Sequence, residues 1–253
     1  MDTIKAVFDY TLREHVRSRA WLSAALFGLV LLGAGAIASV LAVNERGRMV
    51  LDLGLAAILA IGLVSMVFLT VRLVLQEIES RAVFLILTHP VRRWHYLLGR
   101  FFGTLAAVAI GMAGMGLVHW LLLEAFGWAP AGSYALAWVS ILGQVALMGA
   151  LALLLSLALT SEAAAMAFSV FFWVLGHFTP ELRYIAERSG SGPLRGLILA
   201  FARAAPDFSR LDYAGARHAG TPAAWAAWAV LYVLAYGTAC LALSAELFEQ
   251  KEF

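Results

Sequence analysis

Lysine is almost absent from this sequence of 253 residues. Only Lys5 and Lys251 are lysines, and neither follows a glycine-rich turn. Because a nucleotide-binding P-loop needs a lysine there to reach the phosphates, the chain cannot bind ATP in that way. The sequence also lacks a Gly-x-Ser-x-Gly elbow, a His-Glu-x-x-His pair and a Cys-x-x-Cys pair. These absences argue against a P-loop ATPase, a serine hydrolase built on that elbow, and a zinc protease.

Charge and cysteine are scarce as well. Charged residues make up 13% of the chain, and cysteine occurs once, as Cys240, which allows no intrachain disulfide and no cysteine-based metal cluster. Soluble domains carry about a quarter charged residues, whereas 62% of this chain is hydrophobic. Long apolar runs alternate with short charged clusters, which is typical of a chain whose solvent is lipid. We therefore expect a membrane protein that crosses the bilayer several times.

Six apolar segments predict six spans and an all-α membrane fold. A helix needs about 20 apolar residues to cross a hydrocarbon layer of about 30 Å, and only a helix pairs its own backbone polar groups in lipid. The fifth segment is short, so we expect it to end in an irregular or re-entrant stretch. The domain covers residues 1–253, with spans at residues 21–43, 53–71, 101–123, 134–159, 163–178 and 223–247.

The distribution of basic residues, mostly arginine, predicts the orientation of the chain in the membrane. With the amino terminus inside, nine basic residues lie in the amino-terminal tail and in the loop after the second span, and only two lie in the first outside loop. Cytoplasmic loops carry such an excess of arginine and lysine. We expect a bacterial inner-membrane protein with both termini in the cytoplasm. The arginines next to Trp94 and Tyr96 are read as a topology signal, so no nucleic-acid partner is expected.

Two segments outside the spans carry patterns of their own. Residues 1–20 read as an amphipathic helix in the cytoplasmic interface, the alternative being an ordinary solvated helix. The long outside loop, residues 179–222, is expected to hold short helices packed on the outer mouth of the bundle. The apolar positions of the first segment are Ile4, Val7, Phe8, Leu12 and Val16, and its polar positions are Lys5, Asp9, Arg13 and Arg17.

A few polar or small residues within or beside the spans are candidates for special roles. Gly99 and Gly103 have the spacing that lets two helices approach closely, within the chain or in a dimer. His119 and His177, which are predicted at similar depth in the membrane, could hold a haem or a metal. Interfacial histidines with hydrogen-bonded neighbours are the more common case, so no metal is assigned. The candidate polar residues of a pathway are His119, Glu124, Gln144 and His177.

Residues 76–100, QEIESRAVFLILTHPVRRWHYLLGR, are the most informative stretch. They resemble a signature of type-2 ABC transporter permeases, of the copper-site maturation and multidrug types. An acidic–basic start leads to an apolar half-helix, a proline, a basic residue, an aromatic and a Leu-Gly-Arg exit. The resemblance implies that residues 76–96 form a coupling region, in which the helix before the proline acts as a coupling helix on an ATPase. The expected contact residues are Glu77, Glu79, Arg81, Thr88, His89, Pro90, Arg92 and Arg93.

Two further stretches are similar to the same family. Residues 11–19 resemble its amino-terminal elbow helix, and residues 205–212 resemble a Pro-Asn/Asp-Phe stretch before the last span. The chain departs from the family where His89 and Arg92 stand, since serine or glycine is frequent there. The resemblance implies a homodimer in lipid, docked on two copies of a cytoplasmic ABC ATPase that carries the ATP and magnesium, so this chain needs no cofactor and is not an enzyme by itself.

Three functions compete at this point. The first is a permease that exports or extracts an amphiphilic or lipid-like substrate, because no ring of charges lines a pore. The second is a membrane subunit that acts mechanically on a periplasmic accessory protein in an assembly process. The third is an intramembrane redox protein built on His119 and His177.

Overall fold

The computed structural model describes residues 2–17, 26, 28–30, 33, 35, 37, 46–79, 92–125, 127, 133–159, 161–188, 192–212 and 222–250. These residues are helical apart from short turns and links, and none of them lies in a strand, so the predicted all-α class is confirmed. Four helices are long and apolar enough to cross a membrane: α3 (Arg46–Glu79), α5 (Arg93–Ala125), α6 (Ser133–Ala158) and α11 (Pro222–Gln250).

A fifth span depends on two helices taken together. Helix α7 (Glu162–His177) starts at the N-cap Ser161, and the chain then bends by 64° into α8 (Thr179–Arg188). The break falls just before Pro180, whose ring suits the first turn of a new helix but not the middle of an old one. Among the described residues, length and composition therefore give four candidate spans, or five if the bent pair forms one. Most of the first predicted span, residues 21–43, lies outside the described residues, so the count of six stays a prediction.

The long helices extend beyond their apolar runs. Helix α3 continues from the predicted residues 53–71 to Glu79, and α5 begins at Arg93, well before residue 101. The added turns contain Glu, Gln, Arg and Leu, which are good helix formers and need no lipid around them. Both helices thus continue beyond their apolar runs on either side of residues 80–91 of the sequence.

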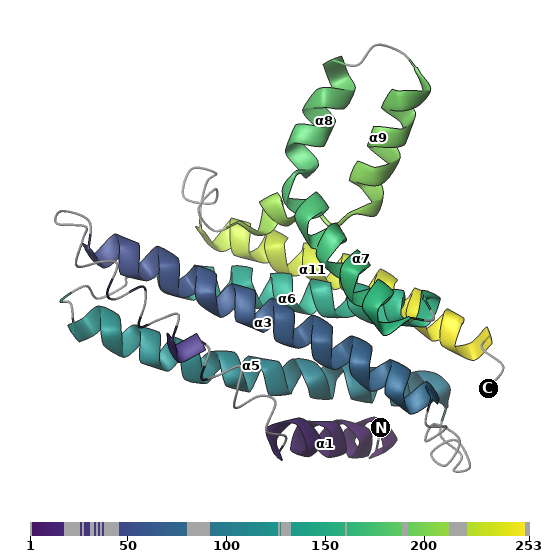
Figure 1. The fold of residues 1–253 in the computed structure, drawn as a ribbon, viewed down its shortest axis with the longest axis horizontal. Helices are drawn as coiled ribbons and strands as arrows, with labels where there is room; N and C mark the ends of the chain where they lie inside the picture. The colour runs from purple at the N-terminus through teal and green to yellow at the C-terminus, as the bar shows by residue number, and fades with distance from the viewer. Residues whose placement is uncertain are drawn as a thin grey trace.

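Helix α6 is the central helix of the bundle. In its most apolar window 72% of the residues are buried, against 11% in α11, which lies at the periphery. Helix α6 packs against α3 on one side and α11 on the other, while α5 packs against α3 (Figure 1). Val145, Leu147 and Met148 of α6 are completely or almost completely buried in this core. The bundle is thus held by apolar packing around one helix.

The amino-terminal helix α1 (Asp2–Arg17) lies along one end of α5 (Figure 1). Its inward face differs in part from the predicted apolar stripe. Thr11 and His15 are the most buried side chains of the helix, whereas Val16, which belongs to the apolar stripe predicted to face the membrane interface, is 44% exposed. The reason is that both polar side chains find hydrogen-bond partners on the bundle, so their burial leaves no orphaned group.

Helices α8 and α9 (Pro193–Ala204) form a hairpin that projects from the side of the bundle at a steep angle to the long helices (Figure 1). The short 3-10 helix η1 (Phe208–Leu211) follows and lies against α6 and α7. Short helices were expected in residues 179–222, and the described part of this segment contains three.

Candidate functional site

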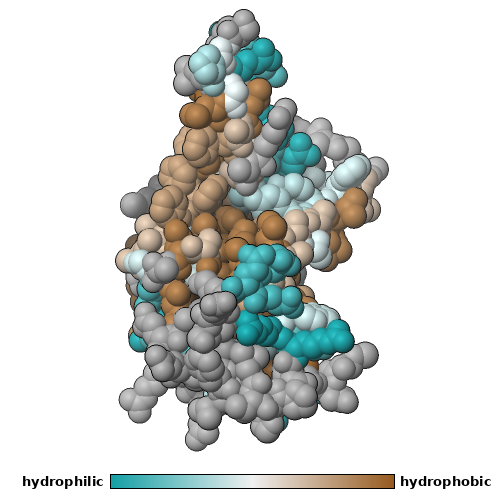
Figure 2. Space-filling model, turned by 90° about the vertical axis from the view of Figure 1, so that its right-hand side faces the viewer, coloured by the Kyte–Doolittle hydropathy of each residue, from teal (hydrophilic) through white to brown (hydrophobic). Residues whose placement is uncertain are grey.

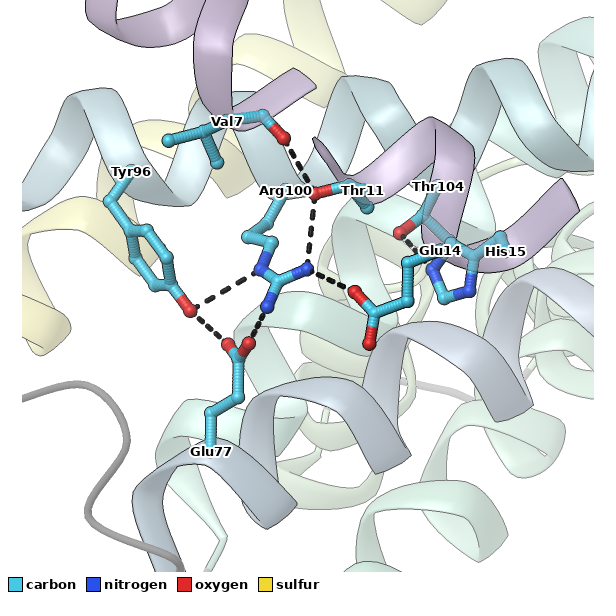
Figure 3. A network of polar contacts seen from close by, with 8 residues as sticks. All are labelled: Val7, Thr11, Glu14, His15, Glu77, Tyr96, Arg100 and Thr104. Atoms are coloured by element: carbon cyan, nitrogen blue, oxygen red, sulfur yellow. Dashed lines mark hydrogen bonds and ion pairs between the residues drawn. The ribbon is translucent and has the colours of Figure 1, made fainter. Parts of the chain in front are cut away.

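Arg100 of α5 is the centre of a polar cluster where α1, α3 and α5 meet (Figure 3). Its guanidinium pairs with the carboxylate of Glu77 from α3 and, at 2.7 Å, with that of Glu14 from α1. It also donates to the hydroxyl of Thr11 at 3.2 Å and to the phenol oxygen of Tyr96 at 3.3 Å. We call Thr11, Glu14, Glu77, Tyr96 and Arg100 the Arg100 cluster.

The hydrogen bonds of the cluster have consistent directions. Tyr96 accepts from Arg100 and donates its own proton to Glu77, and Thr11 accepts from Arg100 and donates to the carbonyl of Val7 at 2.8 Å. The ring of Tyr10 also lies 5.0 Å from the guanidinium carbon, within the range of a cation–π contact. The planar guanidinium has five donors in a fixed fork, so it can hold several acceptors at fixed angles as a lysine could not.

Burial makes this cluster costly to disturb. The side chain of Arg100 is 5% exposed and that of Glu77 is 14% exposed, whereas Glu14 is 44% exposed. A buried charge that loses its partner costs about 3–5 kcal/mol, because the remaining charge is stranded away from water. The relative positions of α1, the end of α3 and the start of α5 are therefore strongly coupled.

The face of α5 beside Arg100 is shaped to receive α1. A Cβ atom built on Gly99 would lie 2.7 Å from Cβ of Val7, and one on Gly103 would lie 2.6 Å from Cβ of Thr11. The two glycines of the Gly-x-x-x-Gly stretch therefore leave room for the close approach of α1 of the same chain. One turn further, the Nε2 atom of His15 is 3.1 Å from the hydroxyl of Thr104.

The carboxyl end of α11 is attached to the same region. Arg93, in the first turn of α5, donates to the backbone carbonyls of Phe248 at 3.3 Å and Glu249 at 3.1 Å. These are among the last carbonyls of α11, which have no partner within the helix and favour a nearby cation. The rings of Tyr96 and Phe248 also stack with centroids 6.3 Å apart. Four helices thus converge at the end of α3 and the start of α5, which flank residues 80–91 in the sequence.

The structure places the predicted ATPase-contacting residues unevenly. Glu77 points into the Arg100 cluster, Arg93 holds the end of α11, and Arg92 is exposed. Glu79 lies at the end of α3, and its side chain is outside the described part of the chain. Arg81, Thr88, His89 and Pro90 also lie outside it. Of the predicted set, Glu77 and Arg93 therefore face the protein itself.

The candidate pathway residues do not form one site. His119 is completely buried, with Nε2 at 3.1 Å from the Val50 carbonyl and Nδ1 at 3.1 Å from the Tyr134 hydroxyl. Glu124 is exposed and accepts from the indole of Trp120. His177 is exposed, and its Nδ1 lies 2.9 Å from the carbonyl of Trp173. Gln144 is buried, and its amide donates at 3.3 Å to Ser140 of its own helix rather than to another helix.

Metal binding finds no support in the described residues. They contain no group of three or more His, Cys, Asp or Glu side chains placed to hold a metal ion. Both ring nitrogens of His119 are already hydrogen-bonded, so neither is available as a ligand without breaking a contact. The geometry is that of a buried histidine that joins three helices.

The sequence interpretation missed several residues of the Arg100 cluster. Arg100 was noted only as the end of the loop signature, and Glu14 and Thr11 only as part of the amino-terminal pattern. One signal could have pointed to them: an arginine at the start of an apolar span needs an acidic partner if it is buried. Which carboxylate pairs with Arg100 depends on how α1 packs on α5, and no local sequence pattern predicts that packing.

Comparison with known proteins agrees with this architecture. The search of curated proteins found no match. The family model described as ABC-2 family transporter protein matches residues 40–180, more than half of the chain, and covers α3, α5, α6 and α7. Members of this family are membrane subunits that associate with ABC ATPases, in which the ATPase activity resides. The chain belongs to the ABC-2 family of transporter proteins and is a multi-pass permease subunit of an ABC transporter.

Proposed function

We propose that this permease couples ATP hydrolysis by two cytoplasmic ABC ATPase subunits to the export or extraction of an amphiphilic or lipid-like substrate. It acts as a homodimer in the bacterial inner membrane, with both termini in the cytoplasm. Residues 76–96 form the coupling region that contacts the ATPase, and α1 serves as the elbow helix. The mechanical role on a periplasmic partner is the alternative.

The observation that carries this proposal is the Arg100 cluster. Residues 80–91 start just after Glu77 and end just before Arg93, and both flanking helices are tied to α1 and α11 through Arg100, Tyr96 and Arg93. A partner that pushes on residues 80–91 therefore acts on four helices at once. If the end of α3 and the start of α5 made no contacts with other helices, the same push would move only those two helix ends.

The substrate class is supported by an apolar groove. It lies between α3, α6 and α7, has a volume of about 260 Å³, and is lined only by apolar side chains, including Val67, Met148, Met166 and Trp173. Pockets for whole drug-sized ligands have volumes of roughly 300–1,000 Å³, so this groove suits a single hydrocarbon chain.

The coupling region is tested by removing its charges. We expect the double variant Glu79→Ala/Arg81→Ala to insert normally but to bind the ATPase about tenfold more weakly, because each charge-assisted contact contributes about 1.5–3 kcal/mol. The control Glu187→Ala/Arg188→Ala removes one acidic and one basic side chain from α8, in the hairpin that projects from the side of the bundle. Binding is measured by titrating the ATPase subunit against the permease in nanodiscs. Equal affinity for the two double variants would overturn the coupling assignment.

The groove is tested separately. Ala60→Trp fills the groove, whereas Leu117→Trp places the same side chain at an exposed position of α5. We expect Ala60→Trp to reduce ATP-dependent movement of a fluorescent phospholipid in proteoliposomes while ATPase binding is unchanged. No movement by the unmodified complex would favour the mechanical role.

The orientation is tested by labelling single cysteines in a Cys240→Ala background. A cysteine at Gly220 should react with a membrane-impermeant reagent from the outside of cells, and one at Gln250 should react only after permeabilisation. The reverse pattern would contradict the proposed topology.

A further inference from the structure

The apolar groove between α3, α6 and α7 ends beside a cation. On α3 its lining includes Ala60, Val64 and Phe68, which are spaced four residues apart and share one face of the helix. The next position on that face is Arg72, whose side chain is exposed. Its guanidinium carbon lies 5.5 Å from the centroid of the Phe68 ring, within the range of a cation–π contact. One aromatic side chain thus both lines the groove and contacts the arginine at its end.

Arg72 differs from Arg93 and Arg100 in what it contacts. Arg100 pairs with two carboxylates, and Arg93 donates to backbone carbonyls of α11. In the described part of the chain no carboxylate forms an ion pair with Arg72. Glu162, in the first turn of α7, is among the acidic residues that do not pair with it. The guanidinium of Arg72 therefore retains donors for a bound anion.

Helix geometry places Arg72 at the edge of the hydrocarbon core. A Cβ atom on Gly149 of α6 would lie 2.2 Å from Cε of Met66, so these two residues are at about the same level. Arg72 is about 9 Å beyond Met66, and α6 continues for about 14 Å beyond Gly149 to Ala158. With 26 residues α6 is about 39 Å long, so it exceeds a core of about 30 Å by a few ångströms at each end. Arg72 therefore lies close to the level at which acyl chains meet headgroups.

The side chain of Arg72 is directed back along the groove. Helical side chains lean towards the amino-terminal end of their helix, and on α3 that direction leads from Arg72 to Phe68 and into the membrane. An arginine that needed only solvation would reach outwards to the interface instead. In Figure 2, which faces this end of the bundle, hydrophilic surface adjoins a broad apolar surface. A ligand at Arg72 therefore meets a cation and an apolar groove within one helical turn.

We infer that Arg72 binds the phosphate of a membrane phospholipid, one of whose acyl chains occupies the groove. This site rests on the proposed function, in which the groove takes the hydrocarbon chain of the substrate, and it adds the headgroup end. In the proposed orientation the lipid comes from the cytoplasmic leaflet.

Both parts of a phospholipid fit what this region offers. The arginine fork can donate two parallel hydrogen bonds to phosphate oxygens. Val64 and Val170 on the groove walls are 68% and 54% exposed, so the groove is open along its side. One acyl chain can therefore enter sideways from the bilayer while the second chain stays there.

The site is tested by photo-crosslinking to the full chain in detergent micelles, without the ATPase. The probe is phosphatidylglycerol with a diazirine in the middle of one acyl chain, titrated at a fixed protein concentration, and the crosslinked peptides are identified by mass spectrometry. Diacylglycerol with the same chains lacks the phosphate, and a diazirine fatty acid supplies a carboxylate instead. Arg72→Gln removes the cation from an exposed position, and the matched control Arg48→Gln makes the same change near the other end of α3.

We expect phosphatidylglycerol to label the α3 and α7 walls of the groove. Its apparent affinity should be about tenfold weaker for Arg72→Gln and unchanged for Arg48→Gln, because only the first variant loses a charge-assisted pair with the phosphate. Diacylglycerol should bind the unmodified protein and Arg72→Gln equally weakly.

Two results would overturn the phosphate site and leave the groove as a surface for an acyl chain. They are equal affinities of the unmodified protein and Arg72→Gln for phosphatidylglycerol, and tighter binding of the fatty acid than of phosphatidylglycerol. Labelling that Ala60→Trp does not reduce would place the acyl chain outside the groove. That result would overturn the site and also contradict the substrate class of the proposed function.

Discussion

Arg100 of α5 and Glu77 of α3 are paired inside the protein, on the two helices that residues 80–91 connect. The pair joins the exit from α3 to the start of α5 without relying on the connecting segment. Glu14 brings α1 to the same guanidinium. A displacement of either flanking helix must therefore break the pair or move α1.

The first prediction concerns the strength of this pair. Arg100→Met should lower the free energy of unfolding by about 3–5 kcal/mol, because Glu77 and Glu14 are left facing each other without a cation. Adding Glu77→Gln to Arg100→Met should recover part of that loss, since the two residues share one interaction. Thermal unfolding in detergent measures both effects.

An exposed ion pair of the same chain provides the control. Arg48 and Asp52 lie 3.8 Å apart on the surface of α3, with side chains 62% and 68% exposed. Solvent screens such pairs, so Arg48→Met should change the stability by less than about 1 kcal/mol. Equal unfolding temperatures for the variants at positions 48 and 100 would show that burial of the Arg100 cluster does not stabilise the protein.

The second prediction concerns the seat of α1 on α5. Gly103→Ala adds a methyl group where Cβ would lie 2.6 Å from Cβ of Thr11 and 3.0 Å from the carbonyl oxygen of Phe8. Because the backbone of α1 blocks the space, we expect α1 to shift and the stability to fall by about 1–3 kcal/mol. Faster proteolysis at Arg13 in the detergent-solubilised protein would report the release of α1.

A glycine-to-alanine substitution at Gly114, on the same helix, is a control for Gly103→Ala, because it changes helix propensity without a packing clash. A Cβ atom there meets nothing within 4 Å, so Gly114→Ala should stabilise the helix by up to about 1 kcal/mol. If both substitutions stabilise the protein, α1 does not sit against Gly103 in solution.

How far the sequence could predict this molecule depends on the kind of interaction. The long apolar runs sufficed for α3, α5, α6 and α11, because lipid allows few alternatives to a helix. The break after α7 was foreseen from Thr179 and Pro180, since proline acts on the local backbone. The contacts of Arg100 with Glu14 and Glu77 were not foreseen, because these partners come from α1 and α3, which meet α5 only in the fold.

The inward face of α1 shows the same limit on a smaller scale. Apolar periodicity predicted a stripe that contains Val7 and Val16 and faces the membrane interface, whereas in the structure Val7 packs against the core of the bundle and Val16 is exposed. Thr11 and His15 take the most buried positions because Arg100 and Thr104 offer them hydrogen bonds. A scale of hydrophobicity cannot represent a polar side chain whose partner is on another helix.

The third prediction is a pH dependence of α1 docking. Burial lowers the pKa of His15 below its ordinary value of 6.5; nearby Glu14 opposes this shift and Arg100 adds to it. The released helix therefore binds a proton more readily than the docked one, so docking is at full strength above about pH 6.5 and weakens as the pH falls through the lowered pKa. We expect faster proteolysis at Arg13 as the pH falls below 6.5.

His15→Gln tests the origin of that dependence. The glutamine amide can still reach the hydroxyl of Thr104 but does not titrate in this range, so the variant should lose the pH effect while α1 remains docked at pH 7.5. An unchanged pH profile in His15→Gln would assign the effect to another group of the cluster.

The fourth prediction concerns His119 and the redox interpretation. The carbonyl of Val50 can only accept, so Nε2 of the His119 ring donates to it, while Nδ1 lies 3.1 Å from the hydroxyl of Tyr134, which also donates to the carbonyl of Gly116 at 3.1 Å. His119→Leu should lower the stability by about 1–3 kcal/mol, because buried polar groups of Val50 and Tyr134 lose a partner. His177→Ala, at an exposed position, should change it by no more than about 0.5 kcal/mol. Since both nitrogens of His119 are engaged, we also expect no haem absorption in spectra of the oxidised and reduced protein. A haem band that disappears in His119→Leu and in His177→Ala would contradict this role and restore the redox hypothesis.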